Sequence, residues 1–444
     1  MTARRDKRNI FVLGYDEAHS TDLLQIRDAE RFLFHPLLHS SEVIHQDNYF
    51  IDEKLGKARD ILNSFEGSID AIICHWDFPA TSMAAILCEE YGLKSPSLEA
   101  VLKCSHKFWS RLEQQKVVPE NTPAFCAVDP FDDQAEDKLS LEYPFWLKPI
   151  KGYGSMLGFR INDAHDFKRA LAIVRDKIRR IGDPFNTILD RIDLPAAVVG
   201  VNGNYLIAEQ FIHGIEIAPE GSVQNGNFTI HGVIDMVRDK NHKSFLRYEY
   251  PSQSPPKIQQ RAINIAEKVL GQIGFDNGCF NMEFFWDRET DDLWIVEINP
   301  RISQSHSYQF EKVNGMSNHE VAIHVALGDK AHLRHGDGPY KHAAKFLLRH
   351  YTQQDALVER APSRADMEQL KALQPDTDVE IRVKQGQRLS TLCDQDPYSY
   401  MLAEIEVAAQ TTHEMLEKYH QAVALLPFEF RAVNGSKQEE SGQT

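Results

Sequence analysis

The chain has 444 residues, of which 42% are hydrophobic and 26% charged, and 49 basic against 65 acidic residues give a net charge of −16. This length predicts roughly two to four domains, and the composition excludes a disordered chain, a collagen-like repeat and a disulfide-rich scaffold. The acidic balance disfavours a nucleic-acid partner, and no run of 18 apolar residues predicts a membrane span. Six scattered cysteines without a Cys-x-x-Cys pair, and an N-terminal apolar run too short for a signal peptide, favour a cytoplasmic protein.

Residues 1–98 are expected to form a small α/β domain with a parallel sheet. Residues 9–13 and 69–74 are short apolar runs typical of buried strands, and residues 83–91 form an amphipathic segment that ends before Gly92. Short strands that alternate with helices indicate a parallel sheet. No G-x-G-x-x-G follows the first strand, so the fingerprint of a dinucleotide site is absent.

The rest of the chain divides into a central region, a smaller α+β unit and a tail. In the central region, residues 99–330, the patterns predict strands at 143–150, 205–212, 228–237, 280–286 and 293–299, helices at 163–181 and 256–273, and a glycine-rich loop at 151–158. In residues 331–434 they predict strands at 379–383, 402–407 and 428–430 and a helix at 413–425. Residues 435–444 are polar and are expected to be disordered.

The two strands at 280–286 and 293–299 are joined by a polar turn and predict a hairpin. If the turn is centred on residue 290, Glu283 lies opposite Glu297 and Asn281 opposite Asn299. Strict alternation would also put Leu293 and Ile295 on the face of Glu297, and Phe285 on the face of Glu283.

Two carboxylates that face each other across a sheet repel, so something must offset the repulsion. One explanation is a proton on one carboxyl group; another is a hard divalent cation, which takes carboxylate and amide oxygens. A third reading is a solvent-facing polar stripe on an edge hairpin. The spacing Glu-x13-Glu-x-Asn offers three oxygen ligands on one face and suits Mg2+.

A lysine and a glycine-rich loop follow one another at the end of the strand 143–150. Lys148 can meet a phosphate with its ammonium group, and the loop from Lys151 to Gly158 can add backbone N–H groups. The loop is not a P-loop, because no Lys-Ser/Thr follows its last glycine. Taken alone, the loop is better explained as an ordinary β-turn.

A third segment, residues 208–216, is extended and then turns at His213-Gly214. Its backbone groups can read the edge of an adenine base, and its carboxylate can accept the ribose hydroxyls. By itself the segment could be any amphipathic strand.

Together these three segments resemble the ATP-grasp superfamily. Residues 295–301 (IVEINPR) look like its metal-binding strand, and residues 104–109 (CSHKFW) resemble the segment that carries its first phosphate-binding lysine. His106 stands where the family often has an aspartate. The resemblance covers roughly residues 9–430 and implies an α/β and α+β architecture: the N-terminal domain, an ATP-grasp clamp with a small lobe at about 110–210 and a large lobe at about 211–330, and a C-terminal α+β cap.

The resemblance also implies roles for individual residues. Lys107 and Lys148 would bind the α- and β-phosphates, and the loop with Gly152, Gly154 and Ser155 would cover the β- and γ-phosphates. Glu209, Gln210, Phe211 and Ile212 would hold adenine, and Glu216 the ribose. Glu283, Glu297 and Asn299 would hold two Mg2+ ions, for which Mn2+ can substitute. Arg301 and Lys148 would act in catalysis, and Ser305, His306 and Tyr308 would contact the second substrate.

The activity implied is that of a carboxylate–amine ligase, which joins a small carboxylic acid and an amine, such as two amino acids, through an acyl phosphate. Residues 299–306 (NPRISQSH) are also similar to the biotin carboxylase string, but Ser305 replaces the glutamate that takes the bicarbonate proton, and no biotin-attachment string is present. A bicarbonate-phosphorylating or thiol-ligating relative, and a non-catalytic ATP-binding protein, are the alternatives. The resemblance allows a homodimer and implies neither nucleic acid nor membrane as a partner.

Overall fold

The structure, a computed structural model, describes residues 7–44, 46, 48–152, 156–239, 244–330, 334–352, 354–392 and 399–436. Its N-terminal domain is built on a parallel sheet with the strand order β2-β1-β3. The elements are β1 (Arg8–Tyr15), α1 (Glu17–Gln25), β2 (Phe32–His39), α2 (Ser40–Val43), α3 (Ile51–Ser64), β3 (Ala71–Ile73) and α4 (Ala80–Glu90). Five consecutive residues of β1 are buried, as expected for a strand that is covered on both faces.

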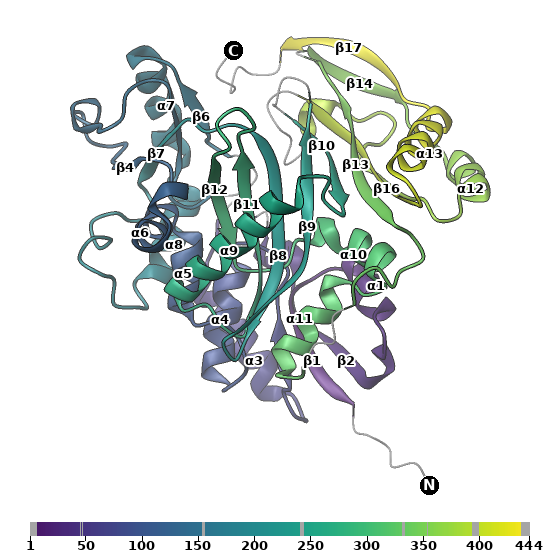
Figure 1. Ribbon diagram of the computed structural model, residues 1–444, viewed down its shortest axis with the longest axis horizontal. Helices are drawn as coiled ribbons and strands as arrows, with labels where there is room; N and C mark the ends of the chain where they lie inside the picture. Colours follow the sequence, from purple (N-terminus) through teal and green to yellow (C-terminus); the bar gives the residue numbers. More distant parts are fainter. Residues whose placement is uncertain are drawn as a thin grey trace.

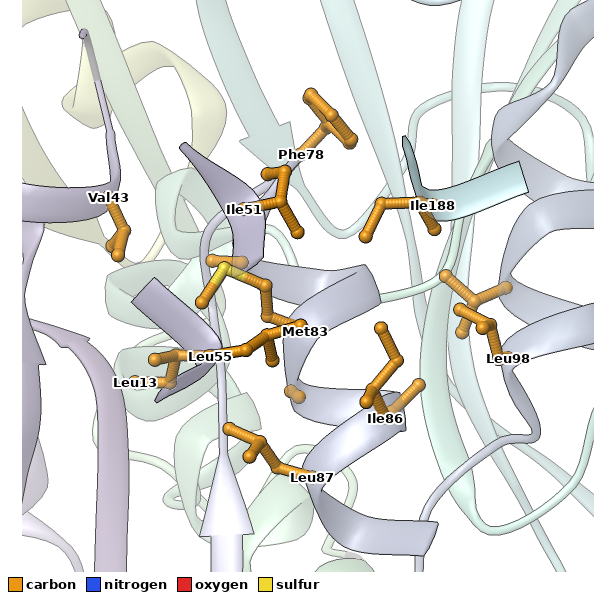
Figure 2. Close-up of a cluster of buried hydrophobic side chains, with 14 of the residues drawn as sticks. Leu13, Val43, Ile51, Leu55, Phe78, Met83, Ile86, Leu87, Leu98 and Ile188 are labelled. Carbon is orange, nitrogen blue, oxygen red and sulfur yellow. The ribbon is translucent and has the colours of Figure 1, made fainter. Parts of the chain in front are cut away.

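The core of this domain extends beyond the domain itself. Figure 2 shows Leu13, Ile51, Phe78 and Met83 packed together with Ile188, which comes from the central region. The N-terminal domain and the small lobe therefore share one apolar cluster, so the position of one constrains the other.

The small lobe is a four-stranded antiparallel sheet with the order β4-β7-β5-β6. Its elements are α5 (Leu98–Ser105), α6 (Lys107–Val117), β4 (Phe125–Val128), β5 (Phe145–Pro149), β6 (Phe159–Ile161), α7 (Ala164–Lys177), α8 (Arg179–Leu189) and β7 (Leu206–Gln210). The single helix predicted at 163–181 is wrong in its extent. The structure has two helices that meet at Ile178, and the second continues to Leu189 because its apolar side chains join the shared core.

The large lobe supplies the first five strands of an eight-stranded sheet, which has the order β12-β11-β8-β9-β10-β13-β16-β15. Its own elements are β8 (Ile215–Gln224), β9 (Asn227–Arg238), β10 (Phe245–Tyr250), α9 (Pro256–Ile273), β11 (Gly278–Trp286), β12 (Leu293–Asn299), α10 (Ser307–Asn314) and α11 (Asn318–Leu327). The apolar side of α9 packs on Phe280, Met282 and Phe284 of β11. The other face of the sheet packs on α10, and α11 lies between the sheet and the N-terminal domain (Figure 1).

The C-terminal region does not form a separate sheet, contrary to the expectation of a distinct cap. It contains β13 (His342–His350), β14 (Gln354–Arg360), α12 (Arg364–Leu373), β15 (Asp378–Ile381), β16 (Tyr400–Ala409), α13 (Thr412–Leu425) and β17 (Glu429–Ser436). Strand β13 pairs with β10, so the large sheet is continuous across residue 331, while β14 and β17 form a small sheet of their own (Figure 1). Strand β17 also takes in the first two residues of the expected tail, and residues 437–444 lie outside the described part.

Candidate functional site

The hairpin of β11 and β12 has the predicted register. Glu283 pairs with Glu297, and Asn281 pairs with Asn299. The register then shifts, because Phe284 pairs with Ile295 and leaves Val296 as an extra residue in β12. Such a bulge turns the following side chains to the other face.

The bulge corrects the predicted faces of β12. Leu293 and Ile295 lie in the apolar core with Ile298 and not beside Glu297. The carbonyl oxygen of Val296 accepts a hydrogen bond of 2.8 Å from the Arg111 guanidinium. The bulge thus separates the acidic end of the hairpin from its apolar end and ties it to the small lobe.

Glu283 is the more perturbed member of the acidic pair. It is half-buried, and burial together with the charges of Glu297 and Glu216 raises its pKa well above the ordinary value. The side-chain nitrogen of Asn299 donates to a Glu283 oxygen at 3.1 Å. The described residues contain no group of three or more His, Cys, Asp or Glu side chains arranged for a metal, so a cation here would rely on two carboxylates, an amide oxygen and oxygens from substrate or water.

Arg301 follows β12 and is held on three sides. Its terminal nitrogens donate to the carbonyl oxygen of Ile302 at 3.1 Å, to Asp77 at 3.3 Å and to the amide oxygen of Asn299 at 3.5 Å. Its Nε is buried and has no acceptor among the described residues. Three of the five N–H donors of the guanidinium are thus engaged, and two, one of them on Nε, are left for a ligand.

Three lysines come together from the small lobe. Lys107 begins α6, and its ammonium lies 3.2 Å from the carbonyl oxygen of Gly152 and 3.9 Å from Glu297. Burial, helped by the charges of Lys148 and Lys151, lowers the pKa of Lys107 to about 8 against the attraction of Glu297. An anion bound among these lysines would relieve their mutual repulsion.

His106, at the position where the family often has an aspartate, caps the helix that begins with Lys107. Its Nδ1 accepts the backbone N–H of Trp109 at 3.2 Å and caps α6, while Nε2 donates to the carbonyl oxygen of Val201 at 2.8 Å. Burial lowers the pKa of His106 to about 4, so the ring is neutral near pH 7. The cap fixes the start of the helix that carries Lys107.

Glu209, which was expected in the adenine site, forms two buried ion pairs. One carboxylate oxygen lies 2.7 Å from Arg111 and the other 2.7 Å from Lys148. Burial would raise the pKa of Glu209, but these two cations lower it to about 2. Because of this ion pair, Glu209 partly balances the positive charge of Lys148.

The segment that was expected to hold adenine lies partly within the small-lobe sheet. The backbone N–H of Gln210 donates to the carbonyl oxygen of Ala124 at 2.8 Å, within the small-lobe sheet. Strand β7 ends there, so Phe211 and Ile212 follow the sheet, and the Arg160 guanidinium lies 4.5 Å from the centre of the Phe211 ring.

Glu216 lies one residue inside β8, buried beside the acidic pair and not at an open turn. One of its oxygens lies 2.7 Å from Arg238, and the other has no hydrogen-bond partner among the described residues. Burial raises the pKa of Glu216 despite Arg238, with a smaller contribution from Glu297. A role with ribose, which was expected of it, would require a hydroxyl group to reach this inner oxygen.

His306 and Tyr308, which were expected to contact a substrate, each have a partner within the protein. His306 is buried, and its Nδ1 lies 2.8 Å from Glu220, which also accepts a 2.7 Å hydrogen bond from Asn318. The Tyr308 hydroxyl donates to the carbonyl oxygen of Asp376 at 2.8 Å, in the C-terminal region. Ser305 is half-buried in the short turn before α10. Gly152 lies at the end of the described part of the glycine-rich loop, whereas Gly154 and Ser155 lie outside the described residues.

The structure adds functional candidates that the sequence did not single out. Lys151 pairs with Asp77 at 2.8 Å, and Arg111 and Arg238 each hold a buried glutamate. The only sequence signal for Asp77 was its place just after a predicted strand, since loops at the carboxyl ends of parallel strands often bind ligands. Its partners lie 74 and 224 residues away, so no local pattern could reveal them.

Comparisons with known proteins agree with this geometry. Residues 141–308 match the ATP-grasp domain family. The L-amino acid ligase from Bacillus licheniformis superposes with a TM-score of 0.73 at 18% identity, over 97% of this chain and 100% of that one. The biotin carboxylase domain dimer of 2-oxoglutarate carboxylase from Hydrogenobacter thermophilus, solved with magnesium ADP and bicarbonate, superposes with a TM-score of 0.59 at 16% identity over 96% and 91% of the two chains.

A shorter match is found to the large chain of carbamoyl phosphate synthase from Pseudothermotoga lettingae, which is 34% identical over 79 residues. That match spans 18% of this chain and only 7% of the synthase. Among the described residues, none of the helices has the length and apolar character that crossing a bilayer requires. The chain therefore carries an ATP-grasp domain within an ATP-grasp fold, which confirms the resemblance and the fold class expected from the sequence.

Proposed function

We propose that the protein is an ATP-dependent carboxylate–amine ligase that forms an amide bond through an acyl phosphate and releases ADP and phosphate. One observation carries the proposal: Lys107, from the start of the small lobe, approaches Glu297 on the same hairpin end that holds Glu283, Asn299 and Arg301. Cations and carboxylates of two lobes thus converge where a triphosphate and a metal ion would be needed.

The nucleotide would lie between the two sheets. Lys107 and Lys148 would contact the α- and β-phosphates, and the loop that begins with Lys151 and Gly152 would cover the β- and γ-phosphates. Glycine at position 152 has no side chain that could keep a phosphate from its backbone. Phe211 and Ile212, which follow β7, would read the adenine.

Glu283, Glu297 and Asn299 fit a hard divalent cation. Two carboxyl groups face each other directly, and burial together with the charges of Glu297 and Glu216 raises the pKa of Glu283 although Arg238 and Arg301 act against this. When bound, Mg2+ would supply charge neutralisation at the phosphate oxygens. The side-chain contact between Asn299 and Glu283 holds these ligands together in advance.

The proposed reaction has two steps. An oxygen of the substrate carboxylate attacks the γ-phosphorus, and the bond to ADP breaks to give an acyl phosphate. The nitrogen of the amine then attacks the acyl carbon, phosphate leaves, and the nitrogen loses a proton. The guanidinium of Arg301, whose buried Nε has no acceptor among the described residues, can donate to an oxygen that becomes negative in either step.

Bicarbonate as the acid receives less support. Ser305 stands where biotin carboxylases keep a glutamate, and a hydroxyl group is not a base at neutral pH. His306, the neighbouring candidate, is bonded to Glu220 inside the protein. The fold match to an L-amino acid ligase covers nearly the whole chain, which favours amino acids as both the acid and the amine.

A screen of acid–amine pairs with ATP and Mg2+ tests the proposal. Phosphate release that requires both an acid and an amine is expected, with a product mass equal to the sum of the two minus water. Glu297→Ala should lower turnover at least about 100-fold, because a group that neutralises transition-state charge is lost. Glu289→Ala, an exposed acid in the turn of the same hairpin, is the matched control and should keep full turnover. Equal turnover of the two variants would contradict the assignment.

A further inference from the structure

Asp77 belongs to the N-terminal domain, in the loop between β3 and α4. The next residue, Phe78, is buried in the core that this domain shares with α8 (Figure 2). The backbone N–H of Phe78 donates to the Asp77 carboxylate at 2.6 Å. The side chain of Asp77 is therefore held by the backbone of Phe78, whose own side chain is packed in the core.

This carboxylate joins two basic residues from two other parts of the chain. One oxygen lies 2.8 Å from the ammonium of Lys151, at the start of the glycine-rich loop, and the other lies 3.3 Å from Arg301, after the metal-binding strand. Lys151 is buried and also lies 5.8 Å from the centre of the Phe78 ring. Without the carboxylate, two cations would be left close together in a partly buried place.

The contact with Asp77 fixes the orientation of the Arg301 guanidinium. Asp77, Asn299 and the carbonyl oxygen of Ile302 occupy its terminal nitrogens, while Nε has no acceptor. A buried N–H without an acceptor costs about 1–3 kcal/mol. A ligand oxygen that accepts a hydrogen bond from the Arg301 Nε would remove this cost.

We propose that Asp77 is a positioning residue for the ligase reaction: it holds Arg301 and Lys151 so that both cations meet the same phosphoryl group. The inference rests on the proposed function and adds to it a role for the N-terminal domain, whose carboxylate would fix Lys151 and Arg301 relative to each other. Burial opposes the charge, but Lys151 and Arg301 hold the pKa of Asp77 far below its ordinary value, so the carboxylate is ionised wherever the enzyme works.

The chain offers a matched control for this contact. Glu320 on α11 is a buried carboxylate that also pairs with the N-terminal domain, through Arg27 at 2.6 Å. This pair joins the same two parts of the molecule and involves neither Lys151 nor Arg301. If Asp77 only held the N-terminal domain in place, Glu320→Gln would cause the same defect as Asp77→Asn.

The first test measures phosphate release by Asp77→Asn, Arg301→Lys, the double variant and Glu320→Gln with the best acid–amine pair of the wild type. The two single site variants should each lower kcat about 100-fold, as expected when a reacting group is misplaced by about 1 Å. The double variant should be hardly slower than either, because both changes remove the same placement of the guanidinium. Glu320→Gln should lose stability but keep kcat within about threefold. Additive losses, or equal kcat values for Asp77→Asn and Glu320→Gln, would overturn the proposal.

A second measurement separates a failure of this inference from a failure of the proposed function. If the wild type releases no phosphate with any pair, the ligase assignment has failed, and binding of magnesium ATP by calorimetry then tests Asp77 directly. Asp77→Asn should bind about tenfold more weakly than the wild type and Glu320→Gln, and Asp77→Glu, which keeps the charge, should recover most of the loss. Equal or tighter binding by Asp77→Asn would overturn the positioning role, and no binding by the wild type would overturn both proposals.

Discussion

Glu209 and Glu283 lie on the two sheets of the candidate site and have opposite surroundings. Glu209 has a cation on each oxygen, and its pKa is lowered to about 2 although burial opposes this. Glu283 faces Glu297 and lies near Glu216, and its pKa is raised by burial and by these charges. A buried carboxylate with its own cations stabilises the fold, whereas one placed against other carboxylates has to be completed by a proton or a metal ion.

The largest change in the free energy of unfolding is expected for Glu209, the carboxylate that has its own cations. Glu209→Gln leaves Arg111 and Lys148 without their anion, and removing one partner of a buried ion pair costs about 3–5 kcal/mol. Urea unfolding should show this loss in the free energy of unfolding. Glu368→Gln, on an exposed pair with Arg364, should change it by less than about 0.5 kcal/mol. A loss below about 1 kcal/mol for Glu209→Gln would mean that Glu209 is not an anchor.

The next effect is pH-dependent and concerns the helix that brings Arg111 to Glu209. The pKa of His106 falls from 6.5 in the unfolded chain to about 4 in the fold, so the unfolded chain binds the extra proton first. The stabilising contribution is therefore complete above pH 6.5 and is lost, by roughly 1.4 kcal/mol for each pH unit, as the pH falls to about 4.

His106→Asn, which can still cap the helix, removes this dependence. The difference in free energy of unfolding between wild type and variant should change steadily over that pH range and stay constant above it. A difference that does not vary between pH 6.5 and pH 4 would show that the ring is not held neutral.

The smallest change in the free energy of unfolding is expected for Glu283, the carboxylate that faces other carboxylates. Glu283→Gln removes one of two facing charges, so it should leave the free energy of unfolding unchanged or raise it by up to about 1 kcal/mol. Its sign is opposite to that of Glu209→Gln, although both variants replace a glutamate in the same region. Urea unfolding at pH 8 in the absence of metal measures it, and a loss above about 1 kcal/mol would count against the repulsion.

Local patterns in the sequence were sufficient where neighbours along the chain decide the structure. The helix α9 spans the predicted residues 256–273 because its apolar side chains recur at helical spacing and Gly274 takes a φ of +76° after its last turn. The register of the hairpin was also predictable, because a symmetric pair of acids and amides surrounds one polar turn.

Contacts between residues far apart in the sequence determine the features that local patterns did not predict. The bulge at Val296 depends on Arg111, which is 185 residues away, and the fate of His306 depends on Glu220, 86 residues away. The expected boundary at residue 331 is crossed by β10 and β13, whose pairing no local pattern marks. The sequence pattern also did not show that Glu209 and Gln210 pair with β5 in the small-lobe sheet.

The most direct test of the acidic pair is a calorimetric titration of ATP into the wild type with and without Mg2+, and into Glu297→Ala with Mg2+. Glu283, Glu297 and Asn299 are proposed to complete their charge with magnesium under a triphosphate. ATP should therefore bind the wild type tightly only when Mg2+ is present, and the variant should lose that gain. Binding that is the same with and without Mg2+, or the same in the variant, would contradict the account.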